Sequence, residues 1–142
     1  MIAAVWHGPN DLRVEERERP KVLPGTVVVK VKACFICGSD LRILREGNSR
    51  ITEPRIIGHE IAGEVVEVGK GVESLNVGDR ISTGADVPCG ECDYCKDGLP
   101  NSCEINYAIG YQFDGGFAEY IRLDHRVVKY GPVQKFDEKL DW

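Results

Sequence analysis

The chain has 142 residues, enough for one domain that buries a hydrophobic core without help from disulfides. Its net charge of −5, with 42% hydrophobic and 29% charged residues, argues against nucleic acid or an anionic membrane as a partner. No apolar run approaches the ~20 residues that span a bilayer, and the first residues lack the basic segment of a signal peptide. We therefore expect a cytoplasmic protein without a membrane partner.

Short strands between glycine-rich turns dominate the expected secondary structure. Alternating β-branched and polar residues predict strands over 26–32, 61–68, 79–83 and 117–123. One short helix is expected over 39–46, capped by Ser39 or Asp40 and ended by Gly47. Residues 137–142 have the pattern of a first helical turn. So many short strands at short spacing predict a mainly β fold of the barrel or sandwich type.

Six cysteines in a protein expected to stay in reducing surroundings indicate metal binding or catalysis rather than disulfides. Four of them have the spacing C-x2-C-x2-C-x7-C and are Cys89, Cys92, Cys95 and Cys103. Two-residue gaps let successive thiolates turn toward one point, and four thiolates complete a tetrahedral Zn²⁺ site with no open position. The pattern predicts a structural zinc site in a lobe over about 86–106. An iron–sulfur cluster is the chemical alternative, because four thiolates also suit iron.

Cys37 and the adjacent pair His59 and Glu60 are the remaining candidate ligands. Taken singly, a cysteine before a helix is usually a core residue, and a lone histidine is usually a satisfied polar side chain. Cys34 and Cys37 also form a C-x-x-C pair, although the apolar residues between them and the strand before them do not favour a redox motif. These residues are informative only as a set.

Several segments, taken together and in order, resemble the medium-chain zinc-dependent alcohol and polyol dehydrogenases. Residues 31–40 resemble the first zinc-ligand motif of that family, and residues 58–69, which begin Gly-His-Glu, resemble the second. The four-cysteine lobe and residues 114–120 follow in the family's order. The resemblance covers nearly the whole chain. It implies a GroES-like β-barrel with a few short helices and a zinc-binding lobe, in one domain over 1–142.

Carried over residue by residue, the resemblance assigns roles around a catalytic zinc. It makes Cys37 and His59 ligands of this zinc, and Glu60 either a direct ligand or a carboxylate behind one. Asp40 is expected to orient His59, because a metal-bound imidazole usually donates its other N–H to a carboxylate. Ser39 resembles the hydroxyl that takes the proton of the bound alcohol. Zinc with three protein ligands keeps a fourth position for water or substrate.

Arg42 departs from the family pattern, because many relatives carry a proton-accepting histidine five residues after the zinc cysteine. Arginine does not titrate at working pH, so we expect Arg42 near a cofactor phosphate, with a solvated helix residue as the alternative. Residues 69–74 are the nearest match to a dinucleotide-binding fingerprint, but they lack its third glycine and fit a hairpin turn better. The resemblance therefore places the last zinc ligand, and a Rossmann domain for NAD or NADP, beyond Trp142.

The sequence supports two hypotheses of different classes. In the first, the chain is the N-terminal domain of a homo-oligomeric, NAD(P)-dependent dehydrogenase that oxidises an alcohol or polyol, and the isolated chain is inactive. In the second, the chain is a stand-alone zinc-binding interaction module without redox activity. Ser39, Asp40 and Glu60 beside the ligands favour the first hypothesis, because a purely structural zinc needs no proton relay.

Overall fold

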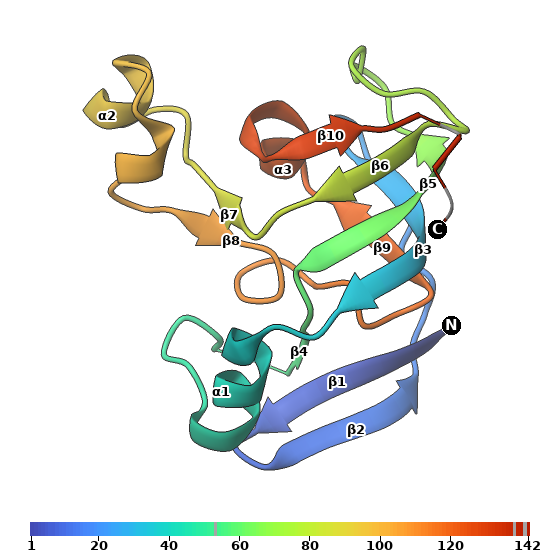
Figure 1. Ribbon diagram of the computed structural model, residues 1–142, viewed down its shortest axis with the longest axis vertical. Coiled ribbons are helices and arrows are strands. Elements are labelled where there is room, and N and C mark those ends of the chain that lie inside the picture. The colour runs from blue at the N-terminus through green and yellow to red at the C-terminus, as the bar shows by residue number, and fades with distance from the viewer. Residues whose placement is uncertain (53, 138, 141) are drawn as a thin grey trace.

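Two antiparallel sheets form the body of the computed structural model, which describes residues 1–52, 54–137, 139–140 and 142 (Figure 1). The larger sheet contains, in spatial order, β10 (Val133–Lys135), β6 (Arg80–Thr83), β5 (Glu60–Val68), β3 (Val27–Phe35) and β9 (Tyr120–Leu123). The smaller sheet contains β2 (Asp11–Glu16), β1 (Ile2–Gly8) and β4 (Arg55–Ile56). A two-stranded ribbon of β7 (Asp86–Val87) and β8 (Tyr107–Ala108) leads to a lobe that projects from the body.

The strands predicted over 26–32, 61–68 and 79–83 correspond to β3, β5 and β6. β5 and β6 pair in antiparallel fashion, so the glycine-rich segment after β5 is the connection of a hairpin, as expected. The strand predicted over 117–123 is shorter, because β9 begins only at Tyr120. Phe117 instead accepts a hydrogen bond from the N–H of Ala4 at 2.8 Å and so connects the chain to the small sheet.

The short helices are α1 (Gly38–Glu46) and α3 (His125–Tyr130) in the body, and α2 (Asp93–Lys96) with the 3-10 turn η1 (Pro100–Ser102) in the projecting lobe. None of the described helices is long and apolar enough to cross a membrane. The helical turn predicted over 137–142 falls partly on residues 138 and 141, outside the described residues. In the rest of this segment, the N–H of Leu140 donates to the carbonyl of Asp137 at 3.1 Å.

The cap of α1 differs from the prediction. The N-cap residue is Cys37, neither Ser39 nor Asp40, and Asp40 lies in the first turn. The Oδ2 atom of Asp40 accepts the backbone N–H of Cys37 at 2.8 Å, which satisfies one of the free donors at the helix start. A carboxylate can therefore stabilise the helix without being its first residue. Gly47 ends the helix at a φ of 78°, as predicted.

The main hydrophobic core lies against one face of the large sheet. Alternate residues of β3, Val27 and Val29, are buried there together with Ile121 and Leu123 of β9. Because successive strand residues point to opposite faces, this two-residue period is what the sequence pattern predicts. A second cluster joins Trp6 of β1 to Ile43 of α1.

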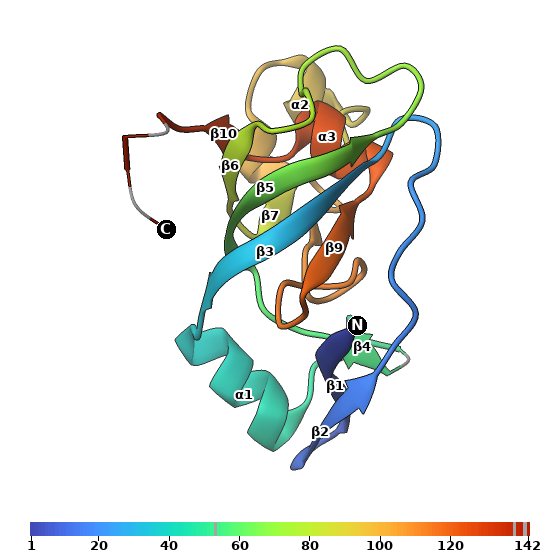
Figure 2. The same ribbon diagram turned by 90° about the vertical axis from the view of Figure 1, so that its right-hand side faces the viewer.

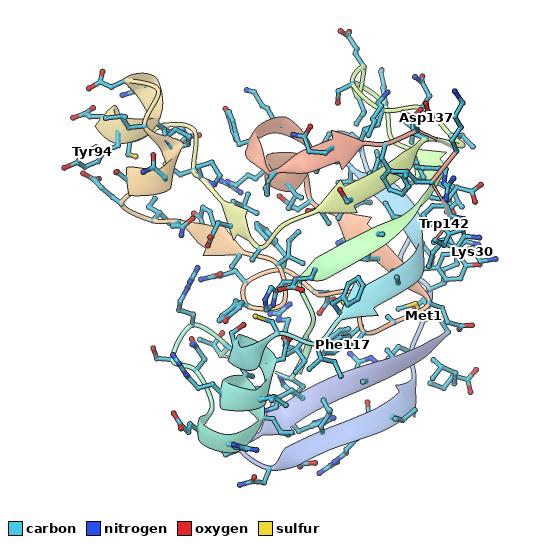
Figure 3. All side chains as sticks on the ribbon, viewed as in Figure 1. Met1, Lys30, Tyr94, Phe117, Asp137 and Trp142 are labelled. Atoms are coloured by element: carbon cyan, nitrogen blue, oxygen red, sulfur yellow. The ribbon has the colours of Figure 1, made fainter. Side chains whose placement is uncertain are left out.

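The second cluster fixes α1 in place. Figure 2 shows α1 following the end of β3 and lying beside the hairpin of β1 and β2. Phe117 packs against this cluster and against the core of the small sheet, and Figure 3 shows its side chain between the two sheets. The start of α1 is thereby held next to the start of β5.

Candidate metal centres

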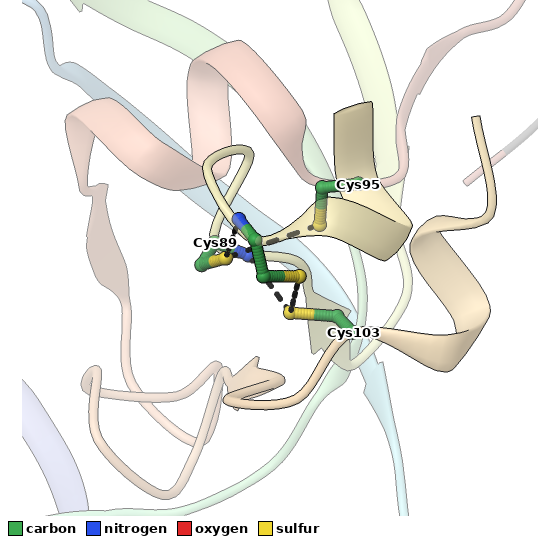
Figure 4. Close-up of side chains that lie close together, drawn as sticks. Cys89, Cys95 and Cys103 are labelled. Atoms are coloured by element: carbon green, nitrogen blue, oxygen red, sulfur yellow. Dashed lines mark hydrogen bonds between the residues drawn. The ribbon is translucent and has the colours of Figure 1, made fainter. Parts of the chain in front are cut away.

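The four cysteines of the lobe converge on one point. The Sγ atoms of Cys89 and Cys95 are 3.9 Å apart, as are those of Cys92 and Cys103 (Figure 4). The ligand atoms of all four lie within 4.8 Å of one another, and all four are free thiols. A tetrahedral zinc with Zn–S bonds of ~2.3 Å holds its sulfurs ~3.8 Å apart. The spacing of the sulfurs therefore fits a single zinc ion.

Backbone N–H groups surround these sulfurs. The N–H groups of Cys89 and Asn106 donate to Cys103 Sγ at 3.2 and 3.3 Å, and those of Glu91 and Cys92 donate to Cys89 Sγ at 3.4 and 3.3 Å. Burial alone would raise the pKa of the Cys103 thiol, but the backbone donors outweigh it and lower the pKa to about 6. The lobe thus stabilises a thiolate, the form that binds zinc.

Gly90 is required at the turn between the first two cysteines. Its φ of +77° lies in the region that favours glycine, and an added Cβ would lie 2.3 Å from the Tyr130 ring. The ribbon of β7 and β8 holds the two ends of the lobe together through the pairs Asp86–Ala108 and Val87–Tyr107. The ribbon and the close approach of Tyr130 at Gly90 thus position the segment between Cys89 and Cys103.

The spacing of the sulfurs also bears on the iron–sulfur alternative. A cluster with several irons attaches its cysteine thiolates to different metal atoms and holds them farther apart than the ligands of one ion. Because the ligand atoms of all four cysteines lie within 4.8 Å of one another, the lobe favours one ion over a cluster.

Cys37, His59 and Glu60 form the second constellation, and their ligand atoms lie within 4.8 Å of one another. Cys37 comes from the start of α1, whereas His59 and Glu60 come from the start of β5. Gly58 allows the chain to turn into β5 at a φ of +94°. An added Cβ there would lie 2.7 Å from the Phe117 ring, so no larger residue fits. The three predicted ligands therefore meet, although they lie on separate elements.

Asp40 lies beside the His59 ring, where it was predicted to be. Their side chains are only 3% and 7% exposed, and Asp40 Oδ1 lies 3.4 Å from His59 Nδ1. Neither atom has another hydrogen-bond partner among the described residues. This carboxylate raises the pKa of His59 to about 9. With Nδ1 directed at Asp40, the other ring nitrogen, Nε2, is left for a metal, and Ser39 Oγ lies 3.2 Å from it.

The two cysteines of the C-x-x-C pair have different environments. The Ser39 hydroxyl is the main cause that holds the pKa of the Cys37 thiol below its usual range. Burial raises the pKa of the Cys34 thiol to about 12, so Cys34 stays protonated. An added Cβ at Gly58 would lie 2.9 Å from Cys34 Sγ, which places this partly buried thiol against the turn at Gly58. Cys37 is therefore the metal-ligand candidate, and the pair does not behave as a matched redox couple.

The donor set of the second constellation fits zinc in a different way from the lobe. It combines sulfur from Cys37, nitrogen from His59 and oxygen from Glu60, which is a mixture that zinc accepts. Glu60 is exposed, whereas His59 is buried, so the constellation faces solvent on one side. Arg42 is an exposed residue of α1, and its expected role at a cofactor phosphate stays a prediction.

Sequence reasoning missed two residues near this constellation. The ring of Tyr111 lies 6.3 Å from the ring of His59, at an interplanar angle of 49°. The guanidinium of Arg50 lies over the Tyr111 ring, 5.1 Å from its centroid. Tyr111 is far from His59 along the chain, and Arg50 lies outside any motif. No sequence spacing therefore indicates either residue.

Residues 23–132 match the family model described as the alcohol dehydrogenase GroES-like domain. The chain belongs to this family. The match confirms the GroES-like β fold and the dehydrogenase resemblance predicted from the sequence. Three similar proteins illustrate the relationship, two by sequence and one by structure.

The zinc-type alcohol dehydrogenase B of Aspergillus flavus is 44% identical over 125 residues, which cover 87% of this chain and 29% of that protein. The L-threonine 3-dehydrogenase of Caldanaerobacter subterraneus is 42% identical over 113 residues, which cover 78% of this chain and 33% of that protein. The RspB alcohol dehydrogenase of Escherichia coli CFT073, solved with the cofactor NADH, superposes with a TM-score of 0.85 and 40% identity over 99% of this chain and 40% of that one. This chain thus spans about a third of the length of its curated relatives.

Proposed function

We propose that residues 1–142 are the N-terminal catalytic domain of a zinc-dependent, NAD(P)-linked dehydrogenase that oxidises an alcohol or polyol. The proposal includes a structural zinc in the lobe over about 86–106 and a dinucleotide-binding domain in the remainder of the full-length enzyme. The observation that carries it is the meeting of Cys37, His59 and Glu60 ligand atoms within 4.8 Å of one another. Relatives named as zinc-type, threonine and NADH-bound alcohol dehydrogenases support it.

Zinc and the nicotinamide cofactor would supply one part of the chemistry, and the residues of this chain would supply the other. Bound zinc would supply a Lewis acid that lowers the pKa of a coordinated hydroxyl, and the nicotinamide cofactor would supply the redox chemistry. Asp40 would hold the His59 ring with Nδ1–H toward its carboxylate, which leaves Nε2 to bind zinc in place of its proton. Ser39, whose Oγ lies 3.2 Å from that nitrogen, would relay the substrate proton: its hydroxyl would take up that proton and give its own to a ribose hydroxyl of the cofactor or to water.

Arg42 and the wider setting belong to the same proposal. Arg42 would lie near a phosphate of the cofactor, so Arg42→Ala should mainly raise the Michaelis constant for NAD⁺ or NADP⁺. A cytoplasmic location would keep the six free thiols reduced and available for metal. The full-length enzyme is proposed to be a homo-oligomer that acts on small alcohols and needs neither nucleic acid nor membrane.

Substitution of Cys37 in the full-length protein tests this function. Cys37→Ser should abolish alcohol oxidation while leaving most of the fold intact, because it removes a ligand at the second constellation only. Cys34→Ala is the matched control, since it removes a neighbouring thiol that stays protonated and should keep measurable turnover. Initial rates with NAD⁺ and NADP⁺, together with circular dichroism, provide the readout. Undiminished activity in Cys37→Ser would contradict the role of the second constellation, whereas no alcohol oxidation by the folded, zinc-loaded wild-type protein would support the interaction-module alternative.

A further inference from the structure

We propose that Arg50 recognises an anionic group, a carboxylate or a phosphate, carried by the alcohol that the second constellation binds. This inference rests on the proposed function above and narrows its substrate class. It adds a specificity-determining residue that lies outside every motif. The argument depends on where Arg50 lies, on what its guanidinium already contacts and on how firmly it is held.

Arg50 lies one aromatic ring away from the metal constellation. It belongs to the segment that connects α1 to β4, and its guanidinium carbon is 5.1 Å from the centroid of the Tyr111 ring. The same ring lies 6.3 Å from the imidazole of His59. A substrate with its hydroxyl at the metal and its anionic group at Arg50 would therefore need a linker of only a few carbon atoms. The Tyr111 ring is positioned to pack against that linker.

The guanidinium of Arg50 contacts only neutral acceptors. Its Nη2 atom donates to the carbonyl oxygen of Asn106 and to Gln112 Oε1, the latter at 3.3 Å. No carboxylate among the described residues pairs with it, although the chain carries 23 acidic residues. A guanidinium has five N–H donors. Both hydrogen bonds of Arg50 come from Nη2, and the donors on Nε and Nη1 have no protein acceptor within the described structure. A half-buried cation with unused donors favours an anionic ligand.

The same contacts hold the guanidinium in place before any ligand arrives. The cation–π contact with Tyr111 and the two hydrogen bonds of Nη2 restrain the position of the guanidinium. A pre-ordered side chain loses little conformational entropy on binding, which favours affinity. Gln112 also accepts the backbone N–H of Ala108 at 3.0 Å, so the turn that carries Tyr111 is tied to Arg50.

Matched pairs of alcohols test the inference in the full-length enzyme. 3-Hydroxybutyrate against 2-butanol tests a carboxylate, and sorbitol 6-phosphate against sorbitol tests a phosphate. At least one anionic probe should exceed its neutral partner in kcat/KM by tenfold or more. Arg50→Gln should reduce that preference to about one, mainly through KM, and Arg50→Lys should keep part of it because the charge remains. Arg45→Gln, at an exposed arginine near the end of α1, should leave the preference unchanged.

A binding readout separates recognition from a structural brace. If 3-hydroxybutyrate is preferred to 2-butanol, butyrate should compete with a neutral alcohol, and the inhibition constant of butyrate should rise about tenfold in Arg50→Gln. If sorbitol 6-phosphate is preferred to sorbitol, inorganic phosphate takes the place of butyrate in the same measurement. If Arg50 only braced the turn, Arg50→Gln would lower the melting temperature and would reduce turnover of anionic and neutral probes equally. That result would overturn the inference. Should Arg50→Gln not fold, the preference of the wild-type and Arg50→Lys enzymes decides.

The two proposals fail in different ways. Equal kcat/KM for anionic and neutral probes in the wild-type enzyme would overturn the role of Arg50 alone. No turnover of any alcohol by the folded, zinc-loaded enzyme would overturn the proposed function, and this inference with it.

Discussion

The two candidate metal centres differ in how much of the chain is needed to build them. The four candidate ligands of the lobe lie between Cys89 and Cys103, in a short segment closed by a two-stranded ribbon. The second centre takes Cys37 from α1 and His59 and Glu60 from β5, which meet only because the sheets and α1 pack together. A self-contained site of four thiolates suits a structural role. A site assembled by the whole fold allows the neighbouring side chains to be chosen for chemistry.

The polar groups around the two candidate centres also differ: backbone N–H groups surround one, and side chains that can hold or transfer a proton surround the other. Backbone N–H groups stabilise the charge on the lobe sulfurs, and backbone amides do not transfer protons under these conditions. The second centre has a hydroxyl and a carboxylate, Ser39 and Asp40, on the two nitrogens of His59. A hydroxyl can pass a proton onward, and a carboxylate can fix a tautomer. The comparison therefore predicts that stability depends mainly on the lobe and turnover on the second centre.

The largest effect is expected from Cys92→Ser. Structural zinc sites supply ~10–16 kcal/mol of binding free energy at neutral pH. Removal of one thiolate should eliminate most of this stabilisation. The variant should lose the lobe zinc, and its melting temperature should fall far more than that of Cys37→Ser. Zinc content and thermal unfolding provide the measurements, with Glu91→Gln as a control at an exposed residue of the lobe. An equal fall in melting temperature in the Cys37 variant would remove the distinction between the centres.

Ser39→Ala tests the proton pathway at the second centre. In the full-length enzyme this change should lower turnover by roughly 10²-fold, the usual scale for loss of a proton-transfer group. Ser74→Ala, which removes an exposed hydroxyl, is the matched control and should have no such effect. Rates are to be measured across pH. Turnover that is unchanged at every pH would reduce Ser39 to a residue of the first helical turn.

Asp40→Asn tests whether Asp40 orients His59, and its expected effect is somewhat smaller than that of Ser39→Ala. Removing the partner of a metal-bound histidine usually lowers metal affinity by about 10–100-fold. Asparagine can still accept the N–H of Cys37, so the cap of α1 is retained. Chelator competition should show weaker zinc binding at the second centre and unchanged binding at the lobe, which serves as the internal control. Equal weakening at both sites would indicate a general loss of structure.

An ordinary ion pair sets the scale for effects away from both centres. Asp79 Oδ2 lies 2.6 Å from Lys135 Nζ and accepts the N–H of Asn76 at 2.7 Å. Lys135 is the main cause that lowers the pKa of Asp79 below 3.8. Since the folded-state pKa is depressed, this stabilisation is present above about pH 4 and is lost as the pH falls through the folded-state pKa.

The expected size is modest because the pair is partly exposed. Asp79→Asn should lower the free energy of unfolding by about 1 kcal/mol at pH 7 and by progressively less below pH 4. Denaturant unfolding between pH 7 and pH 3 measures this difference. A difference that grew on acidification would contradict the assigned sign.

The sequence predicted the convergence of the four lobe cysteines, because their spacing and the glycine between them are local. It also predicted β3, β5 and β6 from their alternation. The ligand set around Cys37 came only from resemblance, since no local pattern joins α1 to β5. The hairpin of β1 and β2 was not anticipated, because β2 places Val14 at 77% exposure and so lacks a buried face. Arg50 and Tyr111 meet through long-range packing, which no spacing rule describes.

Elemental analysis of the purified chain, prepared without added metal, tests the central claim most directly. A lobe complete in its four thiolates should retain zinc through purification, whereas the second centre, with one cysteine, one histidine and one exposed glutamate, should be partly filled. We therefore predict between about one and two zinc ions per chain. A zinc content near zero, or iron in place of zinc, would contradict the account.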